Sequence, residues 1–210
     1  MKRLIIVGAG GFGREVLAWA LEHPDCGAVW EPVGFLDDNA AALDGFDCGL
    51  SVLGPIDGHE PEPEIYYVCA IGAPSIKRGV CEALLAVGAE FIQLVHPSVI
   101  LGPRIVLGPG VVLCPRVTLT TDIQIGAFVA INCHSSVGHD VVIGDWATVS
   151  GHCDLTGGCG LSEEAFLGSG ARILPLKQVA ARSYVGAGSV VIRSTRPGQR
   201  VFGNPALPID

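Results

Sequence analysis

The chain has 210 residues, of which 49% are hydrophobic and 16% charged, and this composition excludes disorder along its whole length. Its 29 glycines follow no Gly-X-Y pattern, which excludes collagen, and a net charge of −8 without a basic stripe disfavours nucleic-acid binding. The eight cysteines contain no C-x-x-C pair, so zinc-ligand spacing is absent and we expect small buried thiols.

The first predicted element is a buried strand over Leu4–Val7, directly after Met1-Lys2-Arg3. This apolar run is shorter than the roughly 7–15 residues of a signal peptide, and no small-residue cleavage site follows it. No other stretch approaches the ~20 apolar residues of a membrane span. We therefore expect a cytoplasmic protein without a membrane partner.

A G-x-G-x-x-G motif follows this strand, with Gly8, Gly10 and Gly13 at its fixed places and Gly11 as a further glycine. Residues 14–22 then predict a helix with one apolar face. Backbone N–H groups of such a loop can hold a diphosphate at the helix N-terminus. NAD is the usual ligand of the motif, yet no hydride-transfer machinery is visible, so a nucleotide or nucleotide sugar is favoured. Glycines needed only for close packing are the alternative.

The next elements complete half of a dinucleotide-binding fold. A second strand over residues 32–36 ends in Asp37 and Asp38, which are placed for a ribose or a base. An acidic surface loop over 54–63 leads to a third strand over 65–70, which ends at Gly72, and to a helix over 75–87. Residues 1–94 therefore predict a half-Rossmann α/β domain that binds a nucleotide sugar.

The second half of the chain repeats every six residues. Residues 95–196 divide into 17 consecutive hexads without an insertion, and the first place is Val, Leu or Ile in all 17. A period of six matches neither a coiled coil nor an α-helix. It is typical of a left-handed parallel β-helix, in which one hexad forms each flat side and three hexads close one coil. The aliphatic first place and the small or apolar fifth place point inward, as at Val111, Ala147 and Cys153.

Together the two halves resemble one family, the sialic-acid O-acetyltransferases and nucleotide-aminosugar N-acetyltransferases of bacterial glycan synthesis. The motifs that carry the resemblance are residues 8–13, 35–38, 70–72, Asn132 with 137–140, and 203–206. The resemblance implies a homotrimer with acetyl-CoA in the groove between adjacent β-helices and no metal. It also implies that residues 1–94 bind the nucleotide and residues 95–210, including a C-terminal tail, transfer the acetyl group.

His139 is the candidate general base, because imidazole titrates near working pH, and Asp140 can fix its tautomer. The resemblance assigns the same two roles and adds Asn132 as a polar support. One coil of three hexads beyond His139 lies Gly157, whose unshielded backbone N–H could stabilise the oxyanion. The resemblance carries this role over as well.

Other inferences from the resemblance concern the co-substrate. Ser169, Ala187 and Gly188 fall where family members line the acetyl-CoA groove, largely through backbone groups. Some aminosugar N-acetyltransferases have a second histidine nine residues after the base, where this chain has Thr148. We therefore expect the substrate contacts of those members to differ here.

His134 and His152 are also three hexads apart and should stack on neighbouring coils. In γ-class carbonic anhydrases two zinc-binding histidines are spaced like His134 and His139, but the place of the third is Ser98 here, and His96 is out of register. A metalloenzyme of this class is therefore a remote alternative. O-acetylation of a sugar such as sialic acid, and a non-catalytic trimeric sugar-binding protein, also remain open.

Overall fold

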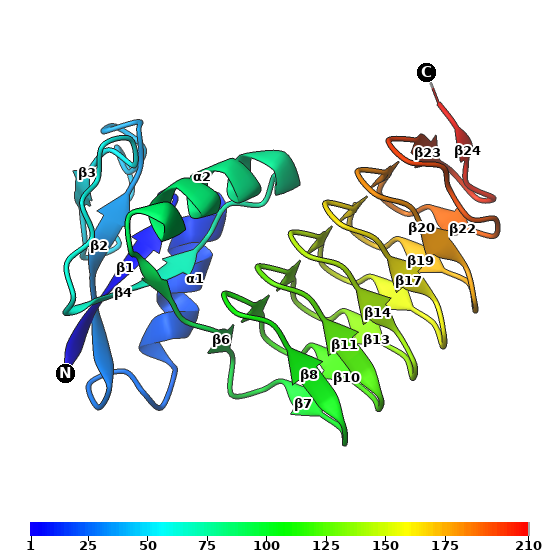
Figure 1. Ribbon diagram of the computed structural model, residues 1–210, viewed down its shortest axis with the longest axis horizontal. Coiled ribbons are helices and arrows are strands. Elements are labelled where there is room, and N and C mark those ends of the chain that lie inside the picture. The colour runs from blue at the N-terminus through cyan, green and yellow to red at the C-terminus, as the bar shows by residue number, and fades with distance from the viewer. Residues whose placement is uncertain (210) are drawn as a thin grey trace.

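A computed structural model describes residues 1–209, and Asp210, the last residue of the predicted second domain, lies outside them. An α/β unit lies against one side of a long solenoid of stacked parallel coils (Figure 1). This architecture confirms the predicted order, a Rossmann-like unit followed by a parallel β-helix.

The α/β unit contains five parallel strands in the order β3-β2-β1-β4-β5 and two helices. Their bounds are β1 (Lys2–Val7), α1 (Gly11–Leu21), β2 (Trp30–Leu36), β3 (Val52–Gly54), β4 (Ile65–Cys69), α2 (Pro74–Ala86) and β5 (Glu90–Phe91). The predicted helices and strands agree with these bounds within three residues. Strands β3 and β5 were not expected, because two or three residues are too few to show a periodic pattern.

The two helices cover opposite faces of this sheet, because alternate strand residues point to opposite sides. Leu4 and Ile6 pack with the apolar stripe of α1, which includes Val16 and Leu17. Ile5 and Val7 pack on the other side, in the cluster that contains Leu84 of α2. Because connections in such a sheet run over the faces, the loops that follow β1, β2 and β4 meet at one edge.

The β-helix has one short strand for each predicted hexad, from β6 (Leu94–Val95) to β22 (Val190–Val191), arranged as three flat faces. Face 1 comprises β6, β9 (Val112–Leu113), β12 (Ala130–Ile131), β15 (Thr148–Val149), β18 (Phe166–Leu167) and β21 (Tyr184–Val185). Face 2 comprises β7 (Ile100–Leu101), β10 (Thr118–Leu119), β13 (Ser136–Val137), β16 (Asp154–Leu155), β19 (Arg172–Ile173) and β22. Face 3 comprises β8 (Ile105–Leu107), β11 (Ile123–Ile125), β14 (Val142–Ile143), β17 (Gly160–Leu161) and β20 (Gln178–Val179).

Neighbouring strands of a face are parallel and lie three hexads apart in the sequence, as in the pairs Val137↔Leu155 and Leu155↔Ile173. Strand β23 (Arg200–Phe202) extends face 1 beside β21, and β24 (Leu207–Pro208) returns antiparallel to close that end. The aliphatic first places and the small fifth places, such as Val111, Ala147 and Cys153, fill one continuous buried core.

Each corner turns through a residue with a left-handed backbone at the fourth place of its hexad. All fifteen fourth places from Arg104 to Gly188 have φ between +54° and +73°, and only four of them are glycine. This conformation is uncommon for residues with a side chain. The surrounding coils therefore impose it, since the fourth-place amides from Asp122 to Gly188 each donate to a carbonyl of the coil before, as where Asp140 N–H donates to Thr121 O.

The α/β unit packs against part of face 1 and part of both corners that border it. At the corner between faces 3 and 1, Phe128 and Trp146 stack with ring centroids 4.5 Å apart and are buried against Cys69 and Cys81. Lys77 of α2 is buried there too, and its Nζ donates to Ala147 O at 3.1 Å and Thr148 Oγ1 at 2.9 Å.

At the corner between faces 1 and 2, Glu22 lies 3.0 Å from His96 Nε2. Cys114 and Cys133 from the same corner join the hydrophobic cluster of α1. The corner between faces 2 and 3 is left as the edge opposite the α/β unit.

Candidate active site

His139 and Asp140 stand together at the corner between faces 2 and 3, directly after β13. The Nδ1 atom of His139 lies 2.7 Å from Asp140 Oδ2. Because an ionised carboxylate only accepts hydrogen bonds, Nδ1 donates, and the lone pair of the neutral imidazole is on Nε2. The two side chains are 65% and 67% exposed, so the pair faces an open surface.

Gly157 lies beside His139, where the three-hexad spacing predicts it. A Cβ atom added to Gly157 would overlap the imidazole, with Nε2 and Cε1 as its nearest atoms. Among residues 1–209, no backbone acceptor pairs with the Gly157 N–H. The absence of a side chain therefore leaves an unshielded peptide group next to the free nitrogen of His139.

Two charged residues of the preceding coils complete this corner. Arg104 Nη2 donates to Asp122 Oδ2 at 2.7 Å, and Thr121 Oγ1 donates to the same oxygen at 2.8 Å. The pKa of Asp122 is lowered to about 2, most strongly by the hydrogen bond from Arg104 and next by that from Thr121. The nearby His139 also lowers this pKa. The Asp122 carboxylate is therefore ionised on the coil before Asp140. Asp122 was not among the predicted site residues, although it precedes Asp140 by three hexads, the length of one coil.

Asn132 lies at a different corner, between faces 1 and 2, and the structure does not bring it to His139 within one chain. Its Oδ1 accepts a hydrogen bond from Cys114 Sγ at 3.3 Å. Ser169, Ala187 and Gly188 occupy the same corner on later coils, where Gly188 N–H donates to Ser169 O at 2.8 Å. The residues predicted for acetyl-CoA thus share an edge with Asn132.

His134 and His152 also lie at this corner, and their rings stack with centroids 4.9 Å apart and an interplanar angle of 3°. Ser98, at the place of a third zinc ligand, instead shares a 2.8 Å hydrogen bond with His96. Within residues 1–209, no three His, Cys, Asp or Glu side chains converge as a metal site.

The glycine loop connects β1 to α1 at the edge where the strands end. Gly8 has φ of +101°, and a Cβ atom there would press on Ala70 O and Ile71, while one on Gly13 would overlap Gly8 O. Gly10 is the N-cap of α1 without a side-chain cap, and Gly10 and Gly11 have open space where a side chain would be. The first N–H groups of α1 are thus open to an anion.

Asp37 and Asp38 follow β2 at the same edge, but both carboxylates already bind backbone N–H groups. Asp37 accepts from Ala9 N–H at 2.8 Å and Asn39 N–H at 2.9 Å. Asp38 accepts from Ile56 N–H at 2.8 Å. The two acids therefore shape the glycine loop and the loop after β3. The half-buried Gly72 follows β4 beside them.

The two groups of predicted residues lie on opposite sides of the β-helix in one chain. The glycine loop belongs to the unit that covers face 1, whereas His139 lies at the corner between faces 2 and 3 (Figure 1). No helix within residues 1–209 has the length and apolar character to cross a bilayer.

Comparisons with known proteins agree with this architecture. Residues 3–84 match the family described as PglD N-terminal domain, whereas no curated protein matches the chain. The acetyltransferase domain of PglB from Neisseria gonorrhoeae FA1090 is 27% identical over 100% of both chains, with a TM-score of 0.90. WeeI from Acinetobacter baumannii AYE is 27% identical over 100% of both chains, with a TM-score of 0.88.

A third similar structure is PerB from Caulobacter crescentus in complex with CoA and GDP-perosamine. It is 28% identical over 100% of this chain and 98% of its own, with a TM-score of 0.86. The likeness to these enzymes thus spans both the α/β unit and the β-helix. Together with the PglD-type domain of residues 3–84, this likeness shows that the chain resembles the nucleotide-aminosugar N-acetyltransferases with hexapeptide repeats.

Proposed function

We propose that this protein transfers the acetyl group of acetyl-CoA to the amino group of a nucleotide-linked amino sugar, with His139 as general base. The observation that carries the proposal is the Asp140-oriented imidazole beside the bare peptide group of Gly157. The similar structures support it, since one is bound to acetyl coenzyme A and another to CoA and GDP-perosamine.

In the proposed step, His139 Nε2 removes a proton from the amino group as its nitrogen attacks the thioester carbonyl carbon. The oxyanion of the tetrahedral intermediate accepts a hydrogen bond from Gly157 N–H. When the intermediate collapses, the carbon–sulfur bond breaks and the thiolate of CoA takes the proton from the imidazolium. Asp140 and Asp122 stabilise that imidazolium while it exists.

Residues 1–94 would bind the nucleotide, and residues 95–210 would carry out the transfer. The open N-terminus of α1, with Gly8, Gly10, Gly11 and Gly13 before and within it, suits the diphosphate. Asp37, Asp38 and Gly72 border the same edge, where they hold or line the loops around the ligand.

We further propose a homotrimer in which two chains share each site. A nucleotide sugar on the α/β unit of one chain faces away from the His139 of that chain, so a neighbouring chain must supply the base. The same packing would bring Asn132, Ser169, Ala187 and Gly188 of one chain toward the His139 corner of the next, with acetyl-CoA between them. The eight free cysteines suit a cytoplasmic protein.

The activity can be tested by incubating the protein with acetyl-CoA and a panel of UDP-, dTDP- and GDP-linked amino sugars while thiol release is measured. We expect release with at least one of them. Release only with free sialic acid would instead support sugar O-acetylation. A protein that binds these sugars without releasing thiol would be a binding protein.

The shared site can be tested by subunit complementation. Gly10→Asp adds a negative charge at the N-terminus of α1 without steric conflict, and His139→Ala removes the base, so each variant alone should be inactive. If two chains share each site, mixed trimers restore about a quarter of the sites. No recovery in mixed trimers would contradict this arrangement.

A further inference from the structure

Two cysteines of the β-helix lie in contact at the corner between faces 1 and 2, next to Asn132. Cys114 follows β9, and its thiol can donate to either of two acceptors, Asn132 Oδ1 at 3.3 Å or the sulfur of Cys133. Both cysteines pack into the hydrophobic cluster of α1, where Cys114 is fully buried and Cys133 is half-buried. Neither thiol has a role in the proposed acetyl transfer.

The coil spacing brings the backbones of the two cysteines to the separation that a disulfide requires. Strand β12 pairs with β9 so that Ile131 lies opposite Leu113. Asn132 is therefore opposite Cys114, and Cys133 is one residue further along the next coil. Neighbouring strands lie about 4.8 Å apart and consecutive Cα atoms about 3.8 Å apart, which separates the two cysteine Cα atoms by about 6 Å. A disulfide spans roughly 4.4–6.8 Å between Cα atoms, so the two sulfurs can join without movement of the coils.

The half-buried thiol has the properties of a reactive cysteine. The hydrogen bond from Cys114 lowers the pKa of Cys133 to about 7, so a large share of this thiol is thiolate at neutral pH. Burial raises the pKa of Cys114, which keeps that sulfur protonated as the donor. Cys133 is therefore the attacking sulfur, and Cys114 is the sulfur that resolves the product.

A second pair of cysteines shows what exposure contributes. Cys69 and Cys81 also share a hydrogen bond, but they are only 3% and 0% exposed. An oxidant reaches that pair only if the fold opens, whereas Cys133 is accessible in the folded protein. Oxidation should therefore be selective for Cys114 and Cys133.

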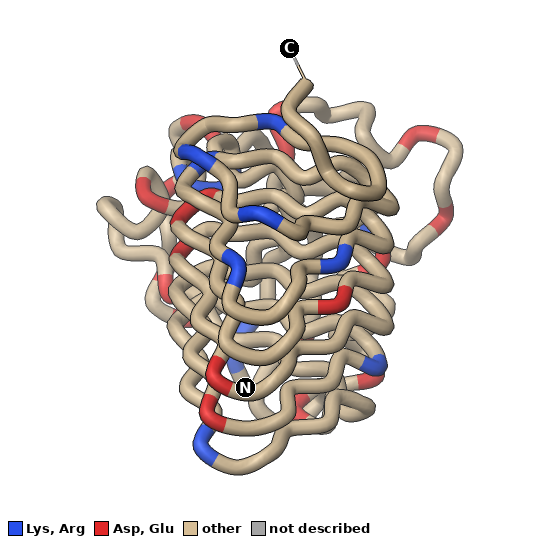
Figure 2. Tube along the Cα trace, turned by 90° about the vertical axis from the view of Figure 1, so that its right-hand side faces the viewer, with Lys and Arg blue, Asp and Glu red and all other residues tan. Residues whose placement is uncertain are grey.

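The coils that follow the accessible pair favour an anionic oxidant. Residues 165–209 contain six Lys or Arg residues and no Asp or Glu, and Figure 2 shows these basic residues in blue on the coils nearest the C-terminus. A positive surface raises the local concentration of a small anion such as oxidised glutathione. Glu15 of α1 lies near both thiols and has the opposite effect, so a neutral disulfide is needed as a second probe.

We propose that Cys114 and Cys133 are a modification site, at which a low-molecular-weight disulfide such as oxidised glutathione converts the two thiols to one disulfide and slows acetyl transfer. In the first step the Cys133 thiolate attacks a sulfur of the oxidant and expels one glutathione thiolate. Cys114 then loses its proton, attacks Cys133 Sγ and expels the second glutathione thiolate. Two protein thiols are oxidised, and one glutathione disulfide is reduced to two glutathione thiols, which take up both protons.

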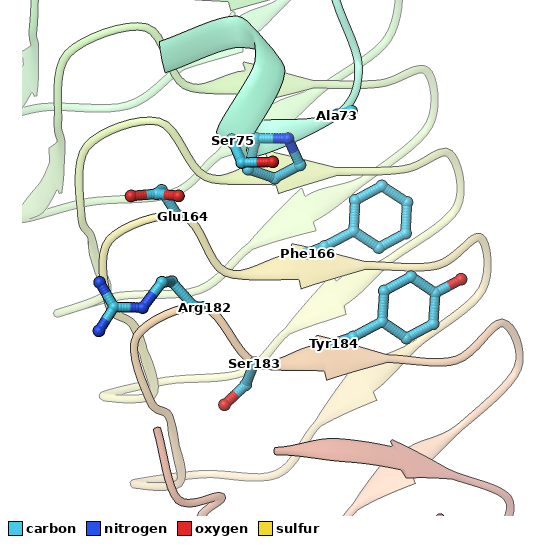
Figure 3. A pocket seen from close by; sticks show the side chains of 8 residues that line it. Ala73, Ser75, Glu164, Phe166, Arg182, Ser183 and Tyr184 are labelled. Atoms are coloured by element: carbon cyan, nitrogen blue, oxygen red, sulfur yellow. The ribbon is translucent and has the colours of Figure 1, made fainter. Parts of the chain in front are cut away.

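The effect on activity is exerted through Asn132 and rests on the proposed function. In the disulfide Cys114 has no proton to donate, so the Asn132 amide loses the hydrogen bond that orients it. Asn132 shares its corner with the residues proposed for acetyl-CoA. By contrast, no cysteine lines the 460 Å³ cavity between α2 and the later coils, which Figure 3 shows with Ser75 and Tyr184. Oxidation should therefore lower kcat and leave the affinity for the nucleotide sugar unchanged.

The test treats the folded protein with oxidised glutathione or with neutral hydroxyethyl disulfide, after which free thiols are alkylated and peptides are mapped by mass spectrometry. With either probe we expect two of the eight thiols to be lost as a disulfide between Cys114 and Cys133, and to return after dithiothreitol. Acetylated product, measured by chromatography, should form about tenfold more slowly after oxidation. Calorimetry should show unchanged binding of the nucleotide sugar.

Three variants assign the effect to this pair. Cys133→Ser should form no disulfide and keep its activity after treatment. Cys114→Ala lacks the resolving sulfur, so a mixed disulfide with glutathione should persist on Cys133, and this variant serves if Cys133→Ser does not fold. Cys26→Ser changes another half-buried cysteine of the same cluster and should be oxidised like the unmodified protein.

Free thiols at Cys114 and Cys133 after treatment would overturn the proposal, as would a disulfide between another pair or a Cys114–Cys133 disulfide without a fall in kcat. Mapping of the disulfide needs no substrate. Absence of acetyl transfer by the reduced protein would therefore overturn the proposed function, and the mapping alone would then decide whether the pair is a modification site.

Discussion

Two corners of the β-helix have the same backbone and different surroundings. At the corner between faces 3 and 1, Trp146 has φ of +65° and is 8% exposed beneath the α/β unit. At the corner between faces 2 and 3, Asp140 has φ of +60° and its side chain is 67% exposed. Because the coils impose the turn at both corners, the side chain does not determine the backbone there. It can therefore pack against the α/β unit at one corner and take part in chemistry at the other.

In this repeat fold, different positions of the hexad determine stability and activity. The core is filled by the first and fifth places of each hexad, which are alike on every face. The fourth places point outward, and each column of them, with one member on every coil, can acquire its own role. Substitutions in different columns should therefore affect different properties.

The largest effect on stability is expected at the covered corner. Trp146→Ala should lower the free energy of unfolding by about 3–5 kcal/mol, because it leaves a cavity beside Phe128. Leu176→Ala is the matched control, since Leu176 has the same hexad place, a φ of +63° and 74% exposure. Thermal and urea unfolding give the stability of both variants. Equal losses of unfolding free energy would contradict the difference in burial between the two corners.

Lys77 of α2, which is buried against the β-helix, gives a pH-dependent effect on stability of similar size. Burial lowers its pKa from 10.5 to about 8, so the unfolded chain binds more protons between these pH values. Stability should therefore rise with pH across this range, by at most about 3 kcal/mol. The free energy of unfolding of Lys77→Met, measured with urea, should lack this rise with pH. That of Lys177→Met should rise as in the unmodified protein.

At the exposed corner, His139→Ala should lower kcat by about 10²-fold, the usual contribution of a general base. The Tm should not change, because the side chain is 65% exposed and contributes little to packing. The measurement is thiol release at saturating acetyl-CoA and nucleotide amino sugar. Full activity of this variant would remove His139 from the mechanism.

A smaller effect is expected for Gly157→Ala, whose methyl group would displace the His139 ring. We expect kcat to fall about tenfold with little loss of stability, since the ring can swing toward solvent. Gly79→Ala is the control, because Gly79 lies within α2 and no atom lies within 4 Å of a Cβ added there. Equal kinetics of the two variants would argue against the close approach at Gly157.

Much of this molecule was predictable from local patterns. The six-residue period predicted one strand for each hexad, because an inward aliphatic residue must recur once on every face. The three-hexad coil predicted the stacking of His134 on His152 and the approach of Gly157 to His139, both of which the structure shows. The left-handed corners were only partly predictable, since Phe128, Trp146 and Leu176 are not residues that favour positive φ.

The sequence by itself determined the two folds, the coil length and the neighbours of each residue along a column, because these depend on periodicity within one segment. Only the tertiary structure decided that Asp37 and Asp38 bind backbone N–H groups. It also decided which face the α/β unit covers and that a cavity opens between Ser75 and Tyr184. Such features depend on contacts between segments far apart in the chain, and no local pattern encodes them.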